Sequence, residues 1–258
     1  MRTDVFTAQG NSHPICQDYG IAGENFVVLS DGCSAAKDSD IGARLVCIAA
    51  RNNIRILSHG PERFYTYLIE DLNCWAGRMG LVPDTFCSTL LVLYAGSSVK
   101  FFAIGDGLLI QSDGHGTQAT KFSFSNNTPF YPVYAMFPTW AERWRSEKHQ
   151  VQQTCDGNRQ TREFDNDLPY VFWELAAAKT TAIATDGIDS FQQIISTETS
   201  STVVPVPGDS ILTDMLSFKS LAGAFVRRRC QRALHDRKKL GISHYDDLSL
   251  GVIVREDE

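Results

Sequence analysis

The chain has 258 residues, of which 43% are hydrophobic and 21% charged, with a formal net charge of −6. This ordinary globular composition can supply a large core, and its acidic balance argues against a general nucleic-acid partner. No apolar run has the length of a membrane helix or the form of a signal peptide, so we expect a cytoplasmic protein without a membrane partner. The odd number of cysteines, 7, and the lack of a Cys-x-x-Cys pair predict neither a disulfide framework nor a zinc ribbon.

The first half of the chain predicts strands on either side of a helix pair. Apolar residues recur at helical spacing from Ser39 to Leu57, and Pro61 begins a second helix that Gly80 ends. Strand-like runs occupy residues 3–8, 17–30, 86–95, 98–104, 107–111 and 118–124. Such runs around helix pairs indicate an α+β fold with helices outside the sheets.

The second half begins with an irregular segment, residues 125–170, that is rich in proline and aromatic residues. We expect a long ordered loop with a little helix, either functional or a surface insertion. A strand at 179–184, a short helix and a polar stretch at 196–208 follow, and that stretch is expected to be mobile. Helices are predicted near 209–217 and 220–239.

Four short acidic pieces lie against apolar runs along nearly the whole chain. They are Cys16-Gln17-Asp18, Ser30-Asp31-Gly32, Thr185-Asp186-Gly187 and Tyr245-Asp246-Asp247. Each piece alone is more typical of a turn than of a ligand. Together, aspartates at strand ends that converge would form an oxygen-only site, which suits Mg²⁺ or Mn²⁺.

The order of these pieces resembles the metal-dependent protein phosphatases of type 2C, the PPM family, in a divergent, mostly bacterial branch. Leu29-Ser30-Asp31-Gly32, Ala103-Ile104-Gly105-Asp106-Gly107, Ala184-Thr185-Asp186-Gly187 and Asp246-Asp247-Leu248-Ser249 are similar to successive motifs of that family. The resemblance runs from about residue 7 to residue 254. It implies a single domain over 1–258, a four-layer α-β-β-α sandwich of two antiparallel sheets flanked by helices, and a flap-like segment at about 125–170.

The resemblance also implies a site for two Mn²⁺ or Mg²⁺ ions. Asp31 would bridge both ions, and Gly32 would offer its backbone carbonyl to one of them. Asp186 and Asp246 would bind the other ion, and Asp18 would hold a coordinated water. Asp106 matches the position that holds a third, weaker ion in bacterial relatives, although a β-turn role for it is equally open.

Several positions depart from the family pattern. Gln17 replaces a glutamate, and Cys33 replaces a histidine proposed as general acid. Asp247, which is expected to orient its neighbour Asp246, stands where the family usually has an asparagine. His13 stands where many members have an arginine that clamps the substrate phosphate, so it is either a weaker phosphate contact or a surface histidine. Ser190 stands where an acidic residue would support a third ion.

Two further polar residues, Asp189 and His244, lie near the acidic motifs in the sequence. Asp189 lies one position before Ser190 and is the acidic residue nearest to the position where the family has an acidic residue for a third ion. His244 is predicted to be an exposed loop histidine, with a supporting role beside Asp246 as the alternative.

These observations predict a metal-dependent phosphatase that removes phosphate from phosphoserine and phosphothreonine, with Asp31 and His13 as catalytic residues. Its substrate would be a phosphoprotein, and an opposing Ser/Thr kinase is the further partner that the resemblance implies. Two alternatives remain open: a non-catalytic or regulatory phosphoprotein-binding module of the same fold, and another two-metal hydrolase such as a nuclease. Against the first, a complete set of clustered carboxylates repels itself unless a cation binds.

Overall fold

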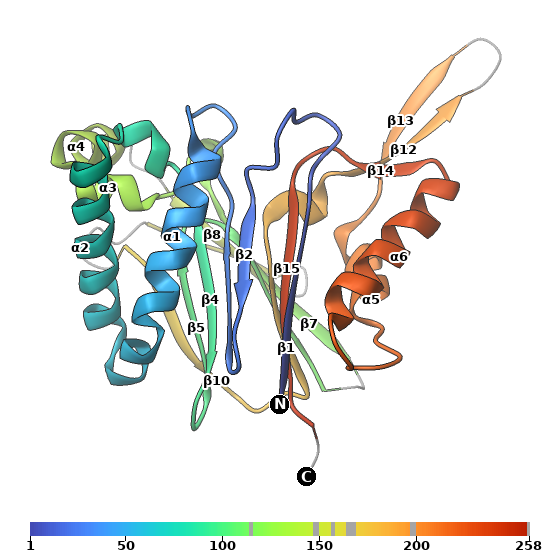
Figure 1. Cartoon of the computed structure of the whole chain (residues 1–258). Helices are drawn as coiled ribbons and strands as arrows, with labels where there is room; N and C mark the ends of the chain where they lie inside the picture. Colours follow the sequence, from blue (N-terminus) through green and yellow to red (C-terminus); the bar gives the residue numbers. More distant parts are fainter. Residues whose placement is uncertain (114–115, 147–149, 156–157, 164–168, 197–199, 257–258) are drawn as a thin grey trace.

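Two antiparallel sheets packed face to face form the centre of this computed structural model, which describes residues 1–113, 116–146, 150–155, 158–163, 169–196 and 200–256 (Figure 1). The seven-stranded sheet has the order β1-β15-β11-β6-β7-β8-β9, and the five-stranded sheet has the order β10-β5-β4-β3-β2. The first sheet contains β1 (Arg2–Ala8), β15 (Leu248–Val254), β11 (Thr180–Ala184), β6 (Gly107–Ser112), β7 (Thr117–Phe124), β8 (Gln150–Cys155) and β9 (Asn158–Glu163). The second contains β10 (Val171–Leu175), β5 (Val99–Ile104), β4 (Leu90–Ala95), β3 (Phe26–Ser30) and β2 (Tyr19–Ala22).

Helices cover the outer face of each sheet. On the five-stranded sheet lie α1 (Ser39–Asn53) and α2 (Pro61–Met79), and on the seven-stranded sheet lie α5 (Gly208–Leu216) and α6 (Phe225–Lys239) (Figure 1). The short helix α3 (Pro132–Met136) packs against α2, and α4 (Pro138–Ser146) packs against α3. The result is the four-layer α-β-β-α sandwich that was predicted, so the predicted fold class is confirmed.

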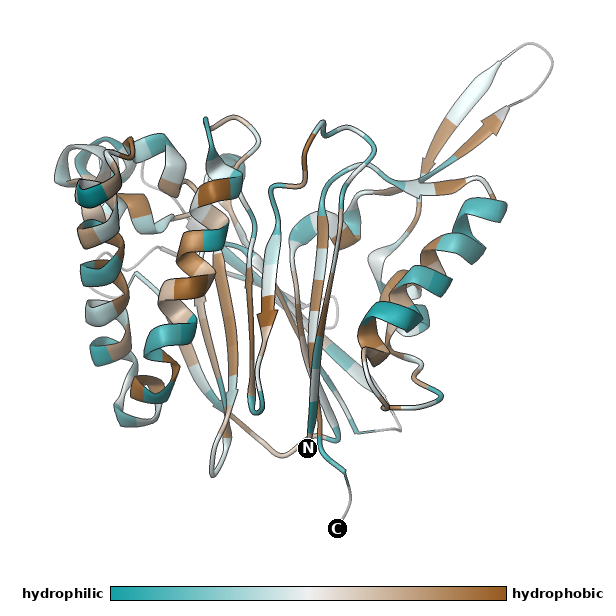
Figure 2. Ribbon diagram, viewed as in Figure 1, coloured by the Kyte–Doolittle hydropathy of each residue, from teal (hydrophilic) through white to brown (hydrophobic). Residues whose placement is uncertain are grey.

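Three hydrophobic clusters separate the layers because side chains alternate along each strand. On β3, Val28 faces the cluster under α1 and α2, whereas Val27 and Leu29 face the cluster between the sheets. On β11, Ile183 faces the central cluster, whereas its neighbour Ala182 faces α5 and α6. In Figure 2 the strands of both sheets carry long hydrophobic stretches, whereas the outer side of α6 is hydrophilic.

Helix and strand limits follow the local sequence closely, with small differences. The α2 helix begins at Pro61 and ends before Gly80, whose φ of 65° is the left-handed value that glycine tolerates. The first helix stops at Asn53 and continues as a 3-10 helix, Ile54–His59. The strand expected from residue 86 begins only at Leu90, because Pro83–Phe86 forms another 3-10 helix.

The expectation for one irregular segment was wrong, and a second irregular segment contains a strand. The segment 125–170 is more than a loop with a little helix, because β8 and β9 lie within it and extend the seven-stranded sheet at its edge; parts of it (147–149, 156–157, 164–168) lie outside the described residues. The stretch 196–208 contains β13 (Ser201–Pro205), which pairs with β12 (Phe191–Ser196) in a three-stranded sheet with β14 (Ile242–His244). Figure 1 shows the β12–β13 hairpin extending away from the sandwich.

Among the residues that the structure describes, no helix combines the length and apolar character needed to cross a membrane. Six cysteines, Cys16, Cys33, Cys47, Cys74, Cys87 and Cys230, are free thiols.

Candidate active site

The topology brings the acidic pieces to one edge of the sandwich. Because every pairing in the two large sheets is antiparallel, β3, β5 and β11 end at the same edge at which β4, β6 and β15 begin. Asp31 follows β3, Asp106 lies between β5 and β6, Asp186 follows β11, and Asp246 precedes β15. Residues that are up to 215 positions apart in the sequence therefore meet at this edge.

Four aspartates line one pocket of about 220 Å³ at this edge. The lining residues are Asp31, Gly32, Cys33, Ser34, Ala35, Thr89, Asp106, Asn127, Pro129, Tyr131, Asp186 and Asp246. Asp18 is only 4% exposed and lies behind the pocket rather than on its wall. The structure thus groups Asp31, Gly32, Asp106, Asp186 and Asp246, and it places Asp18 beside them.

Burial and mutual repulsion make the carboxyl groups of four aspartates, Asp18, Asp31, Asp106 and Asp186, hard to ionise without a cation. Burial and the charges of Asp18, Asp186 and Asp106 raise the pKa of Asp31 well above its usual range. Burial also raises the pKa of Asp18 and the pKa of Asp106, each to about 7. For Asp186, burial and the charge of Asp246 raise the pKa. A bound cation would favour the charged forms of all four groups.

The donors fit a hydrated divalent cation better than a dry cage. Within the described residues, no three His, Cys, Asp or Glu side chains form a closed group around one point. Mg²⁺ commonly keeps several waters and takes only one or two carboxylates, and the pocket offers carboxylate oxygens with room for water. In addition, Asp18 Oδ1 is buried and has no hydrogen-bond partner among the described residues. A buried acceptor of this kind calls for a water or a cation.

Two threonines hold the acidic residues in place, and neither was singled out from the sequence. Thr89 Oγ1 accepts a hydrogen bond from the Asp31 backbone N–H at 3.1 Å, and the Thr89 N–H donates to the Asp31 carbonyl at 2.8 Å. Thr185 Oγ1 donates to Asp18 Oδ2 at 2.8 Å. Thr185 lies inside a segment that matched a family motif, which was the one available sequence signal for it.

Ser190 and Asp189 take structural roles beside the pocket. Ser190 Oγ accepts the backbone N–H groups of Tyr245 at 3.2 Å and Asp246 at 3.1 Å, and it donates to the Gly187 carbonyl at 2.7 Å. It therefore ties the segment of Asp186 to the segment of Asp246. Asp189 forms an ion pair with Lys121 and lines a different pocket. Among the described side chains, neither residue adds a carboxylate to the acidic pocket.

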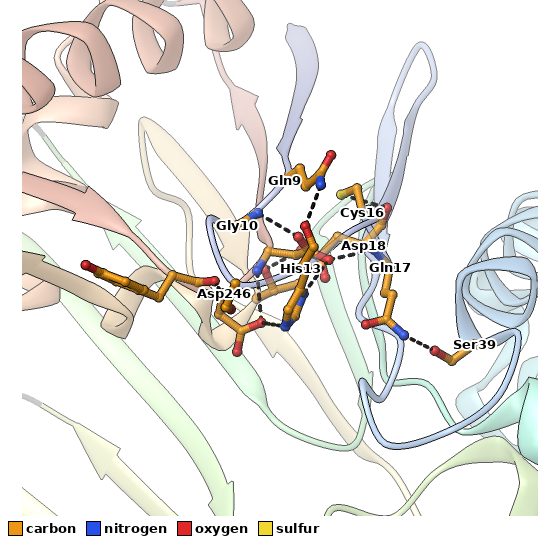
Figure 3. Close-up of polar contacts among 12 residues, drawn as sticks. Gln9, Gly10, His13, Cys16, Gln17, Asp18, Ser39 and Asp246 are labelled. Atoms are coloured by element: carbon orange, nitrogen blue, oxygen red, sulfur yellow. Dashed lines mark hydrogen bonds and ion pairs between the residues drawn. The ribbon is translucent and has the colours of Figure 1, made fainter.

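Gln17 faces the protein rather than the pocket. Its side-chain N–H group donates to Ser39 Oγ at 2.7 Å and to the Cys33 carbonyl at 3.4 Å (Figure 3). Its backbone carbonyl accepts from the Gly32 N–H at 3.2 Å. Gly32 is needed there, because a Cβ on it would stand 2.9 Å from that carbonyl oxygen and 2.8 Å from the Ser39 carbonyl oxygen. Gln17 thus braces the loop that follows Asp31.

His13 lies beside Asp246 and Asp247 at the side of the site (Figure 3). Its Nδ1 is 3.0 Å from Asp247 Oδ2, and its Nε2 is 3.5 Å from Asp246 Oδ1. Burial alone would lower the pKa of His13, but the contact with Asp247 and the charges of Asp246 and Asp18 raise it. The expectation for His244 was wrong: it belongs to β14, is 9% exposed, and its Nδ1 lies 3.0 Å from the Asp246 carbonyl oxygen.

The segment 125–170 forms one wall of the pocket through Asn127, Pro129 and Tyr131. Other aromatic residues of the segment lie inside the protein: Phe130 is 2% exposed and Trp144 is 5% exposed. They belong to the cluster under α1 and α2. Much of the segment therefore packs the domain, while its first residues reach the site.

Comparison with known families identifies the chain. The family model described as protein phosphatase 2C matches residues 10–218, so the chain belongs to the protein phosphatase 2C family. This confirms the resemblance drawn from the acidic motifs. A search of curated proteins found no significant match.

Solved structures show the same fold at low sequence identity. The serine/threonine phosphatase PstP/Ppp of Mycobacterium tuberculosis has a TM-score of 0.58 and 14% identity, with 99% of each chain covered. Stp1, a serine/threonine phosphatase from Staphylococcus aureus, has a TM-score of 0.60 and 12% identity, with 100% of this chain and 96% of that chain covered. The catalytic domain of a PstP in complex with 2 manganese ions has a TM-score of 0.50 and 14% identity, with 97% of this chain and 96% of that chain covered.

Proposed function

We propose that this protein hydrolyses phosphoserine and phosphothreonine in phosphoproteins, with divalent cations held in the acidic pocket. One observation carries the proposal: in a chain of the protein phosphatase 2C family, Asp31, Asp106, Asp186 and Asp246 line a single pocket. The manganese ions of the similar PstP structure support the choice of cation. We propose Mn²⁺ or Mg²⁺, two ions, with a third as an option at Asp106.

The proposed assignment of ligands follows the family resemblance. Asp31 is proposed to bridge two ions, with the Gly32 carbonyl beside it. Asp186 and Asp246, which line the same pocket, are proposed to hold the second ion. Asp18, behind the wall, is proposed to hold a coordinated water through its unpartnered Oδ1.

Charge explains why the pocket needs cations for this reaction. A phosphate monoester is an anion, and the clustered carboxylates of the pocket would repel it strongly in the absence of positive charge. Divalent cations, when bound, supply Lewis acidity and lower the pKa of a water, which makes a nucleophile available at neutral pH. The chain's own contribution is to fix the carboxylates through Thr89, Thr185 and Ser190 and to close one side of the pocket with Tyr131.

Several broader expectations remain proposals. We propose one phosphatase domain over 1–258, in which the segment 125–170 is flap-like and contacts the substrate through the residues at the pocket wall. The proposed partner is a phosphoprotein, with an opposing Ser/Thr kinase as the source of the phosphate. A cytoplasmic location, with no membrane or nucleic-acid partner, is proposed on the same basis.

The experiment measures Mn²⁺-dependent phosphate release from a phosphothreonine peptide, with single-stranded DNA as the competing substrate. Wild-type protein should release phosphate only with Mn²⁺ or Mg²⁺, and Asp31→Asn should retain less than about a tenth of turnover, because a lost central ion costs several kcal/mol of barrier. Asp189→Asn is the matched control and should stay active, since Asp189 pairs with Lys121 outside the pocket. Peptide binding without turnover would favour the regulatory alternative, and DNA cleavage would favour the nuclease.

A further inference from the structure

Asp247 is a buried carboxylate that joins two distant loops. It is 2% exposed, its Oδ1 accepts the Gly10 N–H at 2.7 Å, and its Oδ2 accepts the Gln17 N–H at 2.6 Å. The two loops touch closely, because a Cβ on Gly10 would stand 2.4 Å from the Asp246 carbonyl carbon. Both oxygens of Asp247 are therefore acceptors for backbone N–H groups, a role that an asparagine amide could fill on one side only.

His13 bridges this carboxylate and the neighbouring one. Its Nδ1 approaches Asp247 Oδ2 to 3.0 Å and its Nε2 approaches Asp246 Oδ1 to 3.5 Å, with 16% of its side chain exposed. The Nδ1 approach is an ion-pair contact without the alignment of a regular hydrogen bond. Figure 3 shows the ring lying between the N-terminal loop and Asp246. The backbone of His13 is held as well, since Gln9 Nε2 donates to its carbonyl at 2.6 Å.

His13 and Asp247, which both depart from the family pattern, are thus in contact with each other. An arginine has five N–H donors and can reach a phosphate while it pairs with a neighbour. An imidazole has only two ring nitrogens, and here both face carboxylates. His13 has no further ring nitrogen for a substrate phosphate unless it leaves Asp246 or Asp247.

We propose that His13 is a positioning residue that, together with Asp247, fixes the carboxylate of Asp246 and the loop before Asp18, and that it does not hold the substrate phosphate. The inference rests on the proposed function, because Asp246 is there assigned to a divalent cation. Groups that orient a metal ligand typically change metal affinity or activity by about 10–100-fold when they are removed. A phosphate contact would instead act on substrate binding.

The test compares His13→Ala, Asp247→Asn and the double variant His13→Arg with Asp247→Asn. Mn²⁺ affinity is measured by calorimetry without substrate, and KM and kcat are measured with a phosphothreonine peptide at saturating Mn²⁺. His13→Ala should weaken Mn²⁺ binding by about 10-fold or more, with KM within about twofold of wild type. The double variant, which restores the family pair, should recover much of the Mn²⁺ affinity. His59→Ala is the control at an exposed histidine and should change neither quantity.

The outcomes separate this inference from the proposed function. If wild-type protein binds Mn²⁺ and hydrolyses the peptide but His13→Ala raises KM about 10-fold with unchanged Mn²⁺ affinity, His13 is a phosphate contact and the inference is overturned. Unchanged affinity and kinetics would overturn it as well. If wild-type protein neither binds Mn²⁺ nor releases phosphate, the proposed function fails and the inference fails with it. Asp247→Asn can also unfold the loop. The result for His13→Ala therefore decides whether His13 is a positioning residue or a phosphate contact.

Discussion

Thr185 donates its hydroxyl to Asp18 at 2.8 Å across 167 positions of sequence. The same oxygen accepts the Ser249 N–H at 2.8 Å. One hydroxyl therefore joins the end of β11, the beginning of β15 and the N-terminal loop. Because Asp18 is buried, it depends on this donor to hold one of its two oxygens in place.

Thr185→Val should destabilise the protein by about 2–4 kcal/mol, because a nearly isosteric side chain leaves a buried N–H and a buried carboxyl oxygen unpaired. The melting temperature, measured by calorimetry, should fall by about 2–4 °C for each kcal/mol. Thr66→Val is the matched control: its hydroxyl bonds only to the Glu62 carbonyl on an exposed helix face, so a change within about 0.5 kcal/mol is expected. Equal losses in the two variants would contradict the role of Thr185.

The metal-free protein should become less stable as the pH rises from about 4 to 7. Burial places the pKa of Asp18 and that of Asp106 at about 7 in the folded protein, above the ordinary carboxyl value of 3.8. A raised folded pKa means that the stabilisation is complete below the unfolded pKa and is lost as the pH passes through the folded pKa. Urea unfolding at several pH values, with a chelator present, measures this slope.

Asp106→Asn should flatten that slope and raise the stability of the metal-free protein at pH 8, by on the order of 1–3 kcal/mol, since it removes one buried charge. It should also reduce the stabilisation that Mn²⁺ provides. The exposed Asp209, outside the acidic pocket, supplies the control variant Asp209→Asn. If the pH slope is unchanged in Asp106→Asn, Asp106 does not titrate in this pH range and the prediction is wrong.

Gly187→Ala should disrupt the site, because a Cβ at this position would stand 1.8 Å from the Asp247 carbonyl oxygen. The backbone of Asp247 must then move, and we expect a loss of about 2 kcal/mol or more together with most of the phosphatase activity. Gly77→Ala tests the same substitution on the exposed side of α2, where the new Cβ would meet nothing within 4 Å among the described residues apart from its chain neighbours and its own helix backbone. That control should be neutral or stabilise the protein by about 0.5–1 kcal/mol.

Trp144 and Trp140 should separate packing from substrate selection in the segment 125–170. Trp144 is 5% exposed, and its indole N–H donates to the Thr128 carbonyl at 3.2 Å. Trp144→Ala should cost about 3–5 kcal/mol and reduce activity on a phosphoprotein and on para-nitrophenyl phosphate alike. Trp140 is half-buried and lines a pocket of about 480 Å³ that is formed by residues of the segment 125–170 itself. Trp140→Ala should reduce activity on the phosphoprotein more than activity on para-nitrophenyl phosphate. Equal losses on both substrates would show that Trp140 has a structural role.

The sequence by itself determined the features that depend on local spacing. The apolar periods of 2 and 3.6 predicted the central strands and α1, α2, α5 and α6 because these elements bury one face each. The ordered acidic motifs predicted the family and the aspartates that share the pocket, since each motif stands at a strand end. By contrast, β8, with the sequence Gln-Val-Gln-Gln-Thr-Cys, was missed because its largely polar sequence shows no apolar alternation, and only its pairing with β7 and β9 reveals it as a strand.

Only the tertiary structure decided what lies beside each aspartate. The contact between His13 and Asp247 spans 234 positions, and that between Gln17 and Ser39 joins a loop to a helix. No local pattern encodes such contacts, because they arise when antiparallel strands bring their ends to one edge. From the sequence alone, His13 could be either a phosphate contact or a surface histidine. The packed loops place it between two carboxylates, those of Asp246 and Asp247.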